Sequence, residues 1–133
     1  MRARITRRWP SNFRRRRPPL ALSGPTIWGQ LSEESFLRDF AGDLPADKAR
    51  VLYAVQAPFK RTLLAGKTTH AAWRSKPSWY AVSTEDRTIN PDLQRFMAKR
   101  MGANAIDVKA SDVSLISRPD VITNLILEAA GQA

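Results

Sequence analysis

The stretch Ser78-Trp-Tyr-Ala-Val-Ser83 is followed by Thr84-Glu-Asp-Arg-Thr-Ile89 and then by Asn90-Pro-Asp-Leu-Gln-Arg-Phe-Met97. The first segment is short and rich in aromatic and β-prone residues, which is typical of a buried strand. The third opens with an Asn-Pro pair suited to a helix start, and its apolar stripe runs to a stop at Gly102. We therefore expect a strand, a loop that presents Asp86, and a helix.

The same order repeats immediately. Residues 105–108 predict a second short strand, residues 110–117 a loop, and Pro119 the start of a final helix. Such a β-α-β-α series predicts two parallel neighbouring strands joined by a right-handed crossover. Asp112 occupies in the second loop the place that Asp86 has in the first. Because working side chains gather past the carboxyl ends of parallel strands, this pattern indicates an enzyme scaffold.

The preceding part of the chain predicts helices in quick succession. Ser32 is a good N-cap, and short apolar stripes continue to Gly66, followed by a polar connector. No segment before Ser78 is predicted to be a strand. We divide the chain into a basic arm (1–31), a lid-like helical segment with its connector (32–76) and the β-α-β-α unit (77–133).

Two parallel strands cannot form a stable sheet alone, because such sheets have both faces covered and normally contain more strands. The chain therefore resembles the end of a larger α/β protein. An exposed strand edge predicts self-association or pairing with a partner chain.

Positive charge is concentrated near the N-terminus. The formal net charge is +10, yet residues 1–18 hold eight arginines and no acid, and the rest holds 14 Lys and Arg against 12 Asp and Glu. Charge repulsion and prolines predict a disordered arm over 1–31. Its candidate contacts to nucleic acid or an acidic surface such as an anionic membrane are Arg14, Arg15, Arg16 and Arg17.

Composition excludes several classes. A chain of 133 residues fits one domain, and the absence of cysteine excludes disulfides and cysteine-zinc sites. No apolar run approaches the roughly 20 residues that span a bilayer. The apolar run at 20–22 is too short for a secretory signal, so we expect a cytoplasmic protein. No cofactor is expected.

Five segments together resemble the C-terminal part of an esterase-like α/β-hydrolase with a small helical cap: 32–66, 73–80, 83–89, 90–97 and 111–119. The likeness covers about residues 32–131 and none of 1–31. It implies a partial α/β-hydrolase-like fold, with a helical cap remnant followed by the last β-α-β-α unit of the core. Intact relatives would hydrolyse small esters or amides through a Ser-His-Asp triad.

The resemblance also assigns the site. Asp86 matches the triad acid, and the family's histidine position, after Ser111, is occupied by Asp112. The Gly-x-Ser-x-Gly nucleophile motif is absent. An aspartate cannot relay a proton as imidazole does, and two facing carboxylates raise the pKa of one of them. The resemblance therefore implies a truncated, catalytically incomplete relative.

Three other interpretations stay open. In the first, the chain is a binding protein, not an enzyme, and its arginine arm contacts nucleic acid or an acidic surface. Asp86 and Asp112 could act as metal ligands or as an acid-base couple, or they could be ordinary solvated loop residues and helix caps. His70, the only histidine, lies in the connector and is interpreted as a surface residue.

Overall fold

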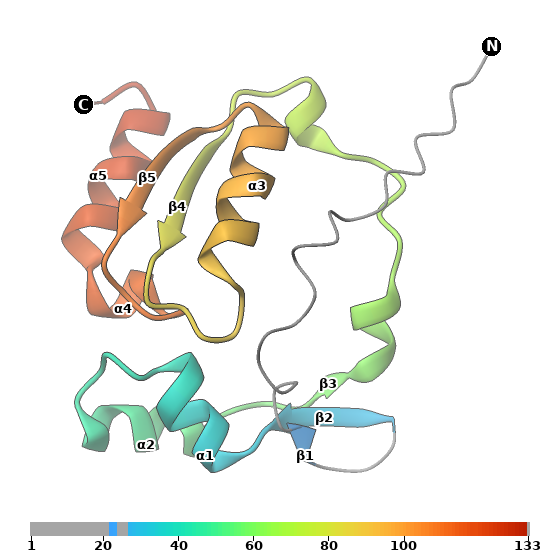
Figure 1. The fold of residues 1–133 in the computed structure, drawn as a ribbon, viewed down its shortest axis with the longest axis vertical. Helices are drawn as coiled ribbons and strands as arrows, with labels where there is room; N and C mark the ends of the chain where they lie inside the picture. The colour runs from blue at the N-terminus through green and yellow to red at the C-terminus, as the bar shows by residue number, and fades with distance from the viewer. Residues whose placement is uncertain (1–21, 24–26, 133) are drawn as a thin grey trace.

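Two small sheets organise the part of the chain that the computed structural model describes, residues 22–23 and 27–132 (Figure 1). One sheet is antiparallel with the order β1-β2-β3, and the other is the parallel pair β4-β5. The strands are β1 (Leu22–Ser23), β2 (Trp28–Leu31), β3 (Phe59–Lys60), β4 (Trp79–Ser83) and β5 (Asn104–Val108).

Helices connect and cover these strands. The α-helices are α1 (Glu33–Ser35), α2 (Ala46–Ala54), α3 (Pro91–Met101), α4 (Ser114–Ser117) and α5 (Pro119–Ala129). A π-helical segment, η2 (Phe36–Phe40), continues α1, and two 3₁₀ turns follow, η3 (Arg61–Ala65) and η4 (Ala72–Arg74). None of the helices in these described ranges is long and apolar enough to cross a membrane.

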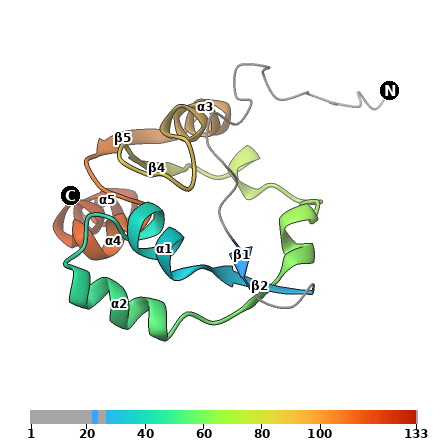
Figure 2. The same ribbon diagram turned by 60° about the horizontal axis from the view of Figure 1, so that its bottom comes forward.

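The predicted β-α-β-α unit is confirmed. β4 and β5 pair in parallel from Trp79 opposite Asn104 to Ser83 opposite Val108. Figures 1 and 2 show α3 on one face of this pair and α5 on the other. Each helix is also tied to the sheet by a polar contact. Trp79 Nε1 donates to Glu128 Oε1 on α5 at 3.1 Å, and Arg95 of α3 binds Asp107 of β5 at 2.7 Å.

The expectation that no strand precedes Ser78 is wrong. β2 lies inside the predicted arm, and Leu31 at its end is only 9% exposed. The Gln56 side chain fixes this strand end, because it accepts from the Leu31 N–H at 2.8 Å and donates to the Leu31 carbonyl at 3.1 Å. The loop predicted over 110–117 likewise contains α4. Residues 1–21 and 24–26, with the four candidate arginines, lie outside the described residues.

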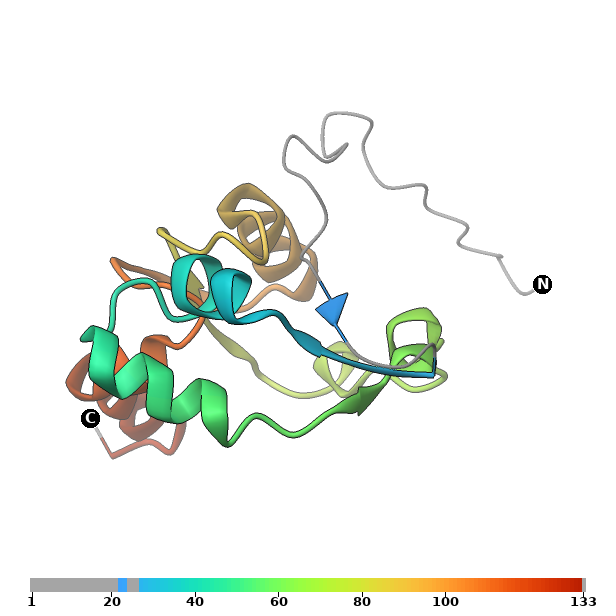
Figure 3. The same cartoon turned by 90° about the horizontal axis from the view of Figure 1, so that it is seen from below.

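A hydrophobic core joins the helical segment to the loop after β5. The Phe36 ring packs against Phe40 and Tyr53, with ring centroids 5.0 and 5.7 Å away. The buried members of this cluster are Leu31, Phe36, Ala41, Ala49 and Val113. Val113 comes from the loop after β5, so the core holds that loop against the helices, as the view from below shows (Figure 3).

The end of α3 generates the first testable prediction. Gly102 has φ of 63°, and its N–H caps the helix by donating to the Lys99 carbonyl at 3.2 Å. Gly102→Ala should lower the free energy of unfolding by about 1 kcal/mol, because an L-residue is strained there although a Cβ would meet no atom within 4 Å. Urea unfolding measures the change.

Gly102→Asn is the matched control, because asparagine adopts the left-handed region more readily and should cost less. Equal stability of the alanine variant and the wild type would contradict the assigned backbone geometry.

Candidate functional site

Backbone hydrogen bonds bring the loops after β4 and β5 together. The parallel ladder continues past the strands, with Thr84 N donating to the Val108 carbonyl at 2.9 Å and Glu85 N donating to the Ala110 carbonyl at 3.0 Å. The two predicted site residues, Asp86 and Asp112, follow directly in these loops. The structure therefore places them at the same end of the sheet, as the sequence predicts.

Asp86 is buried, with 4% of its surface exposed. Its Oδ1 accepts hydrogen bonds from Thr88 N at 2.7 Å, Thr88 Oγ1 at 2.7 Å and Ile89 N at 2.9 Å. Its Oδ2 accepts from Gln94 Nε2 at 2.7 Å. Asp86 is thus the organiser of its own loop, and the interpretation as a solvated loop residue is wrong.

Gln94 of α3 connects this loop to the strand. Its side chain is also 4% exposed, and its Oε1 accepts from Ser83 N, the last residue of β4, at 3.0 Å. Sequence reasoning missed Gln94. The available signal was its place three residues before Met97 and seven before Met101, on the apolar face of the helix. A lone amide on such a face indicates a buried polar contact.

Asp112 shares a hydroxyl with Asp86. Thr88 Oγ1 lies within hydrogen-bond distance of Asp86 Oδ1 and also of Asp112 Oδ2. A hydroxyl carries one proton, so both contacts are hydrogen bonds only when one carboxyl group is protonated. Burial raises the pKa of Asp112, and the charge of Asp86 raises it further, against the opposing effect of the Thr88 hydrogen bond. Asp112 is therefore the member of the pair that takes up the proton as pH falls.

The same charges reach the strand. Burial, followed by the negative charges of Asp86 and Asp112, raises the pKa of the Tyr80 hydroxyl in β4. The end of the parallel pair is accordingly an acidic, partly desolvated environment.

Ser111 ties the second loop to the helical segment. Its N–H donates to Asp43 Oδ2 at 3.0 Å, and its hydroxyl lies within hydrogen-bond distance of Asp43 Oδ1 and of the Phe40 carbonyl, at 2.9 Å. Burial alone would raise the pKa of Asp43, but several hydrogen bonds, of which the one from the Ser111 hydroxyl has the largest effect, together outweigh burial and lower it. Sequence reasoning did not single out this contact, because 68 residues separate its partners.

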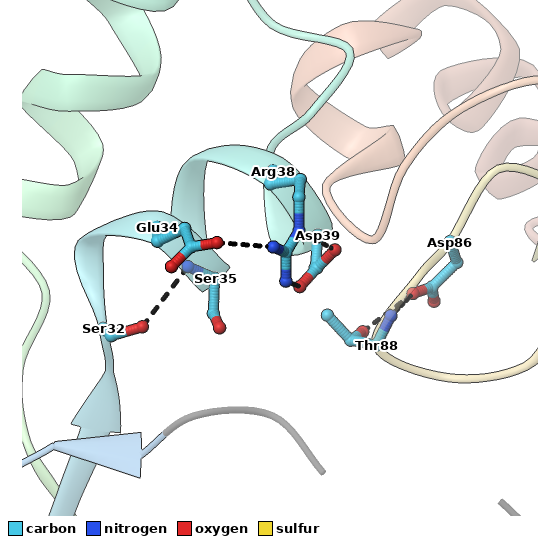
Figure 4. A network of polar contacts seen from close by, with 7 residues as sticks. All are labelled: Ser32, Glu34, Ser35, Arg38, Asp39, Asp86 and Thr88. Atoms are coloured by element: carbon cyan, nitrogen blue, oxygen red, sulfur yellow. Dashed lines mark hydrogen bonds and ion pairs between the residues drawn. The ribbon is translucent and has the colours of Figure 1, made fainter. Parts of the chain in front are cut away.

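A pocket of about 610 Å³ opens between η2 and the two loops. On the η2 side, the Arg38 guanidinium is engaged by Glu34 at 2.6 Å and by Asp39 at 2.7 Å. Figure 4 shows this ion-pair group facing the loop that carries Asp86 and Thr88. The pocket lining comprises Leu37, Arg38, Gly42, Asp43, Thr84, Glu85, Asp86, Arg87, Pro91 and Ser111.

His70 does not join this site. It lies in the connector between η3 and η4, which runs along the opposite side of the molecule in Figures 1 and 3, and its Nδ1 contacts Thr69 Oγ1 at 3.0 Å. Across residues 22–23 and 27–132, no group of three or more His, Cys, Asp and Glu side chains is arranged to hold a metal ion.

Comparison with known proteins identifies the family. The family model described as "Alpha/beta hydrolase family" matches residues 1–125. The chain belongs to the alpha/beta hydrolase family. This match corrects the expectation that residues 1–31 bear no likeness to the family.

Individual relatives agree with this family and with the fold. The chain is 33% identical over 75 residues to the alpha/beta hydrolase nvfD of Aspergillus novofumigatus. The aligned region covers 54% of this chain and 30% of nvfD. The crystal structure of polyneuridine aldehyde esterase matches with a TM-score of 0.67 and 13% identity, over 84% of this chain and 48% of the esterase. The crystal structure of a mutant of that esterase matches with a TM-score of 0.66 and 13% identity, over 82% of this chain and 47% of the mutant chain. The chain thus spans less than half of each of these alpha/beta hydrolases.

The Gln94 contacts predict a large effect on stability. Gln94→Ala should lower the free energy of unfolding by about 2–3 kcal/mol, because it leaves the Ser83 N–H and one oxygen of Asp86 buried without their partner. Arg95→Ala is the matched control on the same helix, where the loss of exposed ion pairs should cost much less. Equal losses in urea unfolding would contradict the assigned role of Gln94.

The shared hydroxyl predicts a pH effect. A pKa that is raised on folding stabilises the protein below the unfolded value of Asp and loses that contribution as pH rises through the folded value. Asp112→Asn supplies a permanent N–H donor to Thr88 and removes the titration. It should therefore raise stability at pH 7 by about 1 kcal/mol, allowing for the partial exposure of Asp112.

The measurement is thermal unfolding of both proteins from acidic to neutral pH. The advantage of Asp112→Asn should shrink as pH falls and Asp112 itself becomes protonated. A constant difference, or one that grows toward acidic pH, would contradict the shared proton.

Proposed function

We propose that this chain is a truncated, catalytically incomplete alpha/beta hydrolase. In this proposal it keeps the cap-like helices, the triad acid position at Asp86 and the last β-α-β-α unit of the core. Intact relatives hydrolyse a small ester or amide by acyl transfer, and the pocket between η2 and the two loops is what this chain retains of their substrate site. The likeness to polyneuridine aldehyde esterase supports the esterase-like class.

The observation that carries the proposal is the Thr88 hydroxyl between two carboxyl groups. A triad acid orients a histidine by accepting its N–H, and the histidine moves the proton of the nucleophile. Here the group linked to Asp86 through Thr88 is a second acid, Asp112. Both oxygens of Asp86 also already accept hydrogen bonds from its own loop and from Gln94.

The electrostatics point the same way. Burial and the neighbouring charge of Asp86 raise the pKa of Asp112, but a carboxyl group does not relay a proton as imidazole does. No Gly-x-Ser-x-Gly motif supplies a nucleophile in this sequence. Loss of a single triad member commonly costs several orders of magnitude in rate, so a chain without the nucleophile motif and with Asp112 at the family's histidine position is expected to be inactive.

The test is hydrolysis of short p-nitrophenyl esters by the wild type, Asp86→Ala and Asp112→His. We expect none of the three to exceed the buffer rate, because a restored imidazole still lacks a nucleophile. Asp120→Ala, which removes an exposed carboxylate of α5 that does not line the pocket, is the control for nonspecific effects.

Robust turnover by the wild type that Asp86→Ala abolishes and Asp120→Ala preserves would overturn the proposal. Turnover gained through Asp112→His alone would show that the chain holds a nucleophile.

A further inference from the structure

Exposed apolar side chains gather at the end of the molecule that β2, β3 and η3 form. Ile27 is 64% exposed and Trp28 41%, and Leu63 and Leu64 of η3 are 69% and 72% exposed. These residues are neighbours in space because Trp28 pairs with Lys60 across β2 and β3, and η3 begins at the next residue. Figures 1 and 3 show this end away from α4 and α5.

Two basic residues, Lys60 and Arg61, lie at the same end of the molecule and contact Trp28. Lys60 Nζ lies 5.5 Å from the ring centroid of Trp28. Arg61 Nε donates to the Trp28 carbonyl at 2.9 Å, and Arg61 N donates to the Ile27 carbonyl at 3.0 Å. We name this surface the β2–η3 patch and define it by Ile27, Trp28, Lys60, Arg61, Leu63 and Leu64.

In the folded part, basic and acidic residues are nearly equal in number, but they lie in different segments of the sequence. Residues 48–84 contain seven Lys and Arg and no acid, while every Asp and Glu of the chain lies within 33–47 or 85–128. β3, η3, η4 and the connector all fall in the acid-free range. The arm is therefore not the only basic part of the chain, because residues 48–84 form a basic segment within the folded part.

We propose that the β2–η3 patch docks on the surface of an anionic lipid bilayer. Exposed apolar groups framed by Lys and Arg suit the bilayer interface, where the apolar groups enter the acyl boundary and the cations meet anionic headgroups. A contiguous exposed apolar surface on a folded protein marks an interaction site. A partner complementary to this surface must offer both apolar groups and negative charge.

A nucleic acid fits the patch less well. Single-stranded nucleic acids bind by stacking bases on aromatic faces, whereas the most exposed side chains here are aliphatic. The Trp28 ring, the aromatic ring of the patch, already has the Lys60 cation over it.

The experiment is co-sedimentation of the full chain with phosphatidylcholine vesicles that contain either no phosphatidylserine or about one third phosphatidylserine. The wild type should bind the anionic vesicles and bind the neutral ones at least tenfold more weakly. Leu63→Ser/Leu64→Ser should lower the partition coefficient on anionic vesicles by about tenfold or more, since two exposed leucines no longer enter the acyl boundary.

A matched pair controls for apolar content and folding. Val51→Ser/Val55→Ser removes two side chains that are 62% and 71% exposed on and after α2, and it should leave vesicle binding unchanged. A second variant tests the charges: Lys60→Gln/Lys67→Gln should weaken binding by about fivefold per cation on anionic vesicles only. Circular dichroism of each variant verifies that it folds.

Three results would overturn the proposal. One is equal vesicle binding by the leucine variant and the wild type, and another is equal binding to neutral and anionic vesicles. The third is tighter binding to polyuridylate than to anionic vesicles with the same dependence on Leu63 and Leu64, which would assign the patch to nucleic acid. None of these residues lines the pocket, so each result is independent of the proposal of a catalytically incomplete hydrolase.

Discussion

The buried carboxylate of Asp86 is the constraint on which the parallel pair and its loops depend. It accepts hydrogen bonds from Thr88, Ile89 and Gln94, and Gln94 in turn holds the end of β4. A buried charge is tolerated only where hydrogen bonds replace the lost water. The loop, the strand end and the start of α3 are therefore one polar unit, and removal of the Gln94 side chain leaves the Ser83 N–H and Asp86 Oδ2 without this partner.

The helical segment is attached to this unit by two different kinds of contact. Val113 enters the core beside Phe36, and Ser111 binds Asp43 through its backbone and hydroxyl. Asp112 lies between these two anchors and reaches Thr88. The second acid is thus held close to the first by packing as well as by hydrogen bonding.

Strong local signals made the β-α-β-α unit predictable from sequence. The N-cap at Asn90 and the glycine stop at Gly102 both appear in the structure, as does the parallel pairing. β1 and β3 are two residues each, too short for any hydrophobic period, so they could not be predicted. The placement of Asp86 and Asp112 at one edge follows from topology. Their shared hydroxyl depends on distances between loops, which spacing along the chain does not contain.

The titration of the Asp112 side chain tests the central claim most directly. Carbon-13 NMR of the aspartate carboxyl groups, assigned with Asp112→Asn, follows this group through pH. The account predicts a midpoint above the ordinary aspartate value of about 3.5–3.9, and a lower midpoint after Asp86→Asn removes the neighbouring charge. A midpoint at or below the ordinary value, unchanged by Asp86→Asn, would contradict the shared proton.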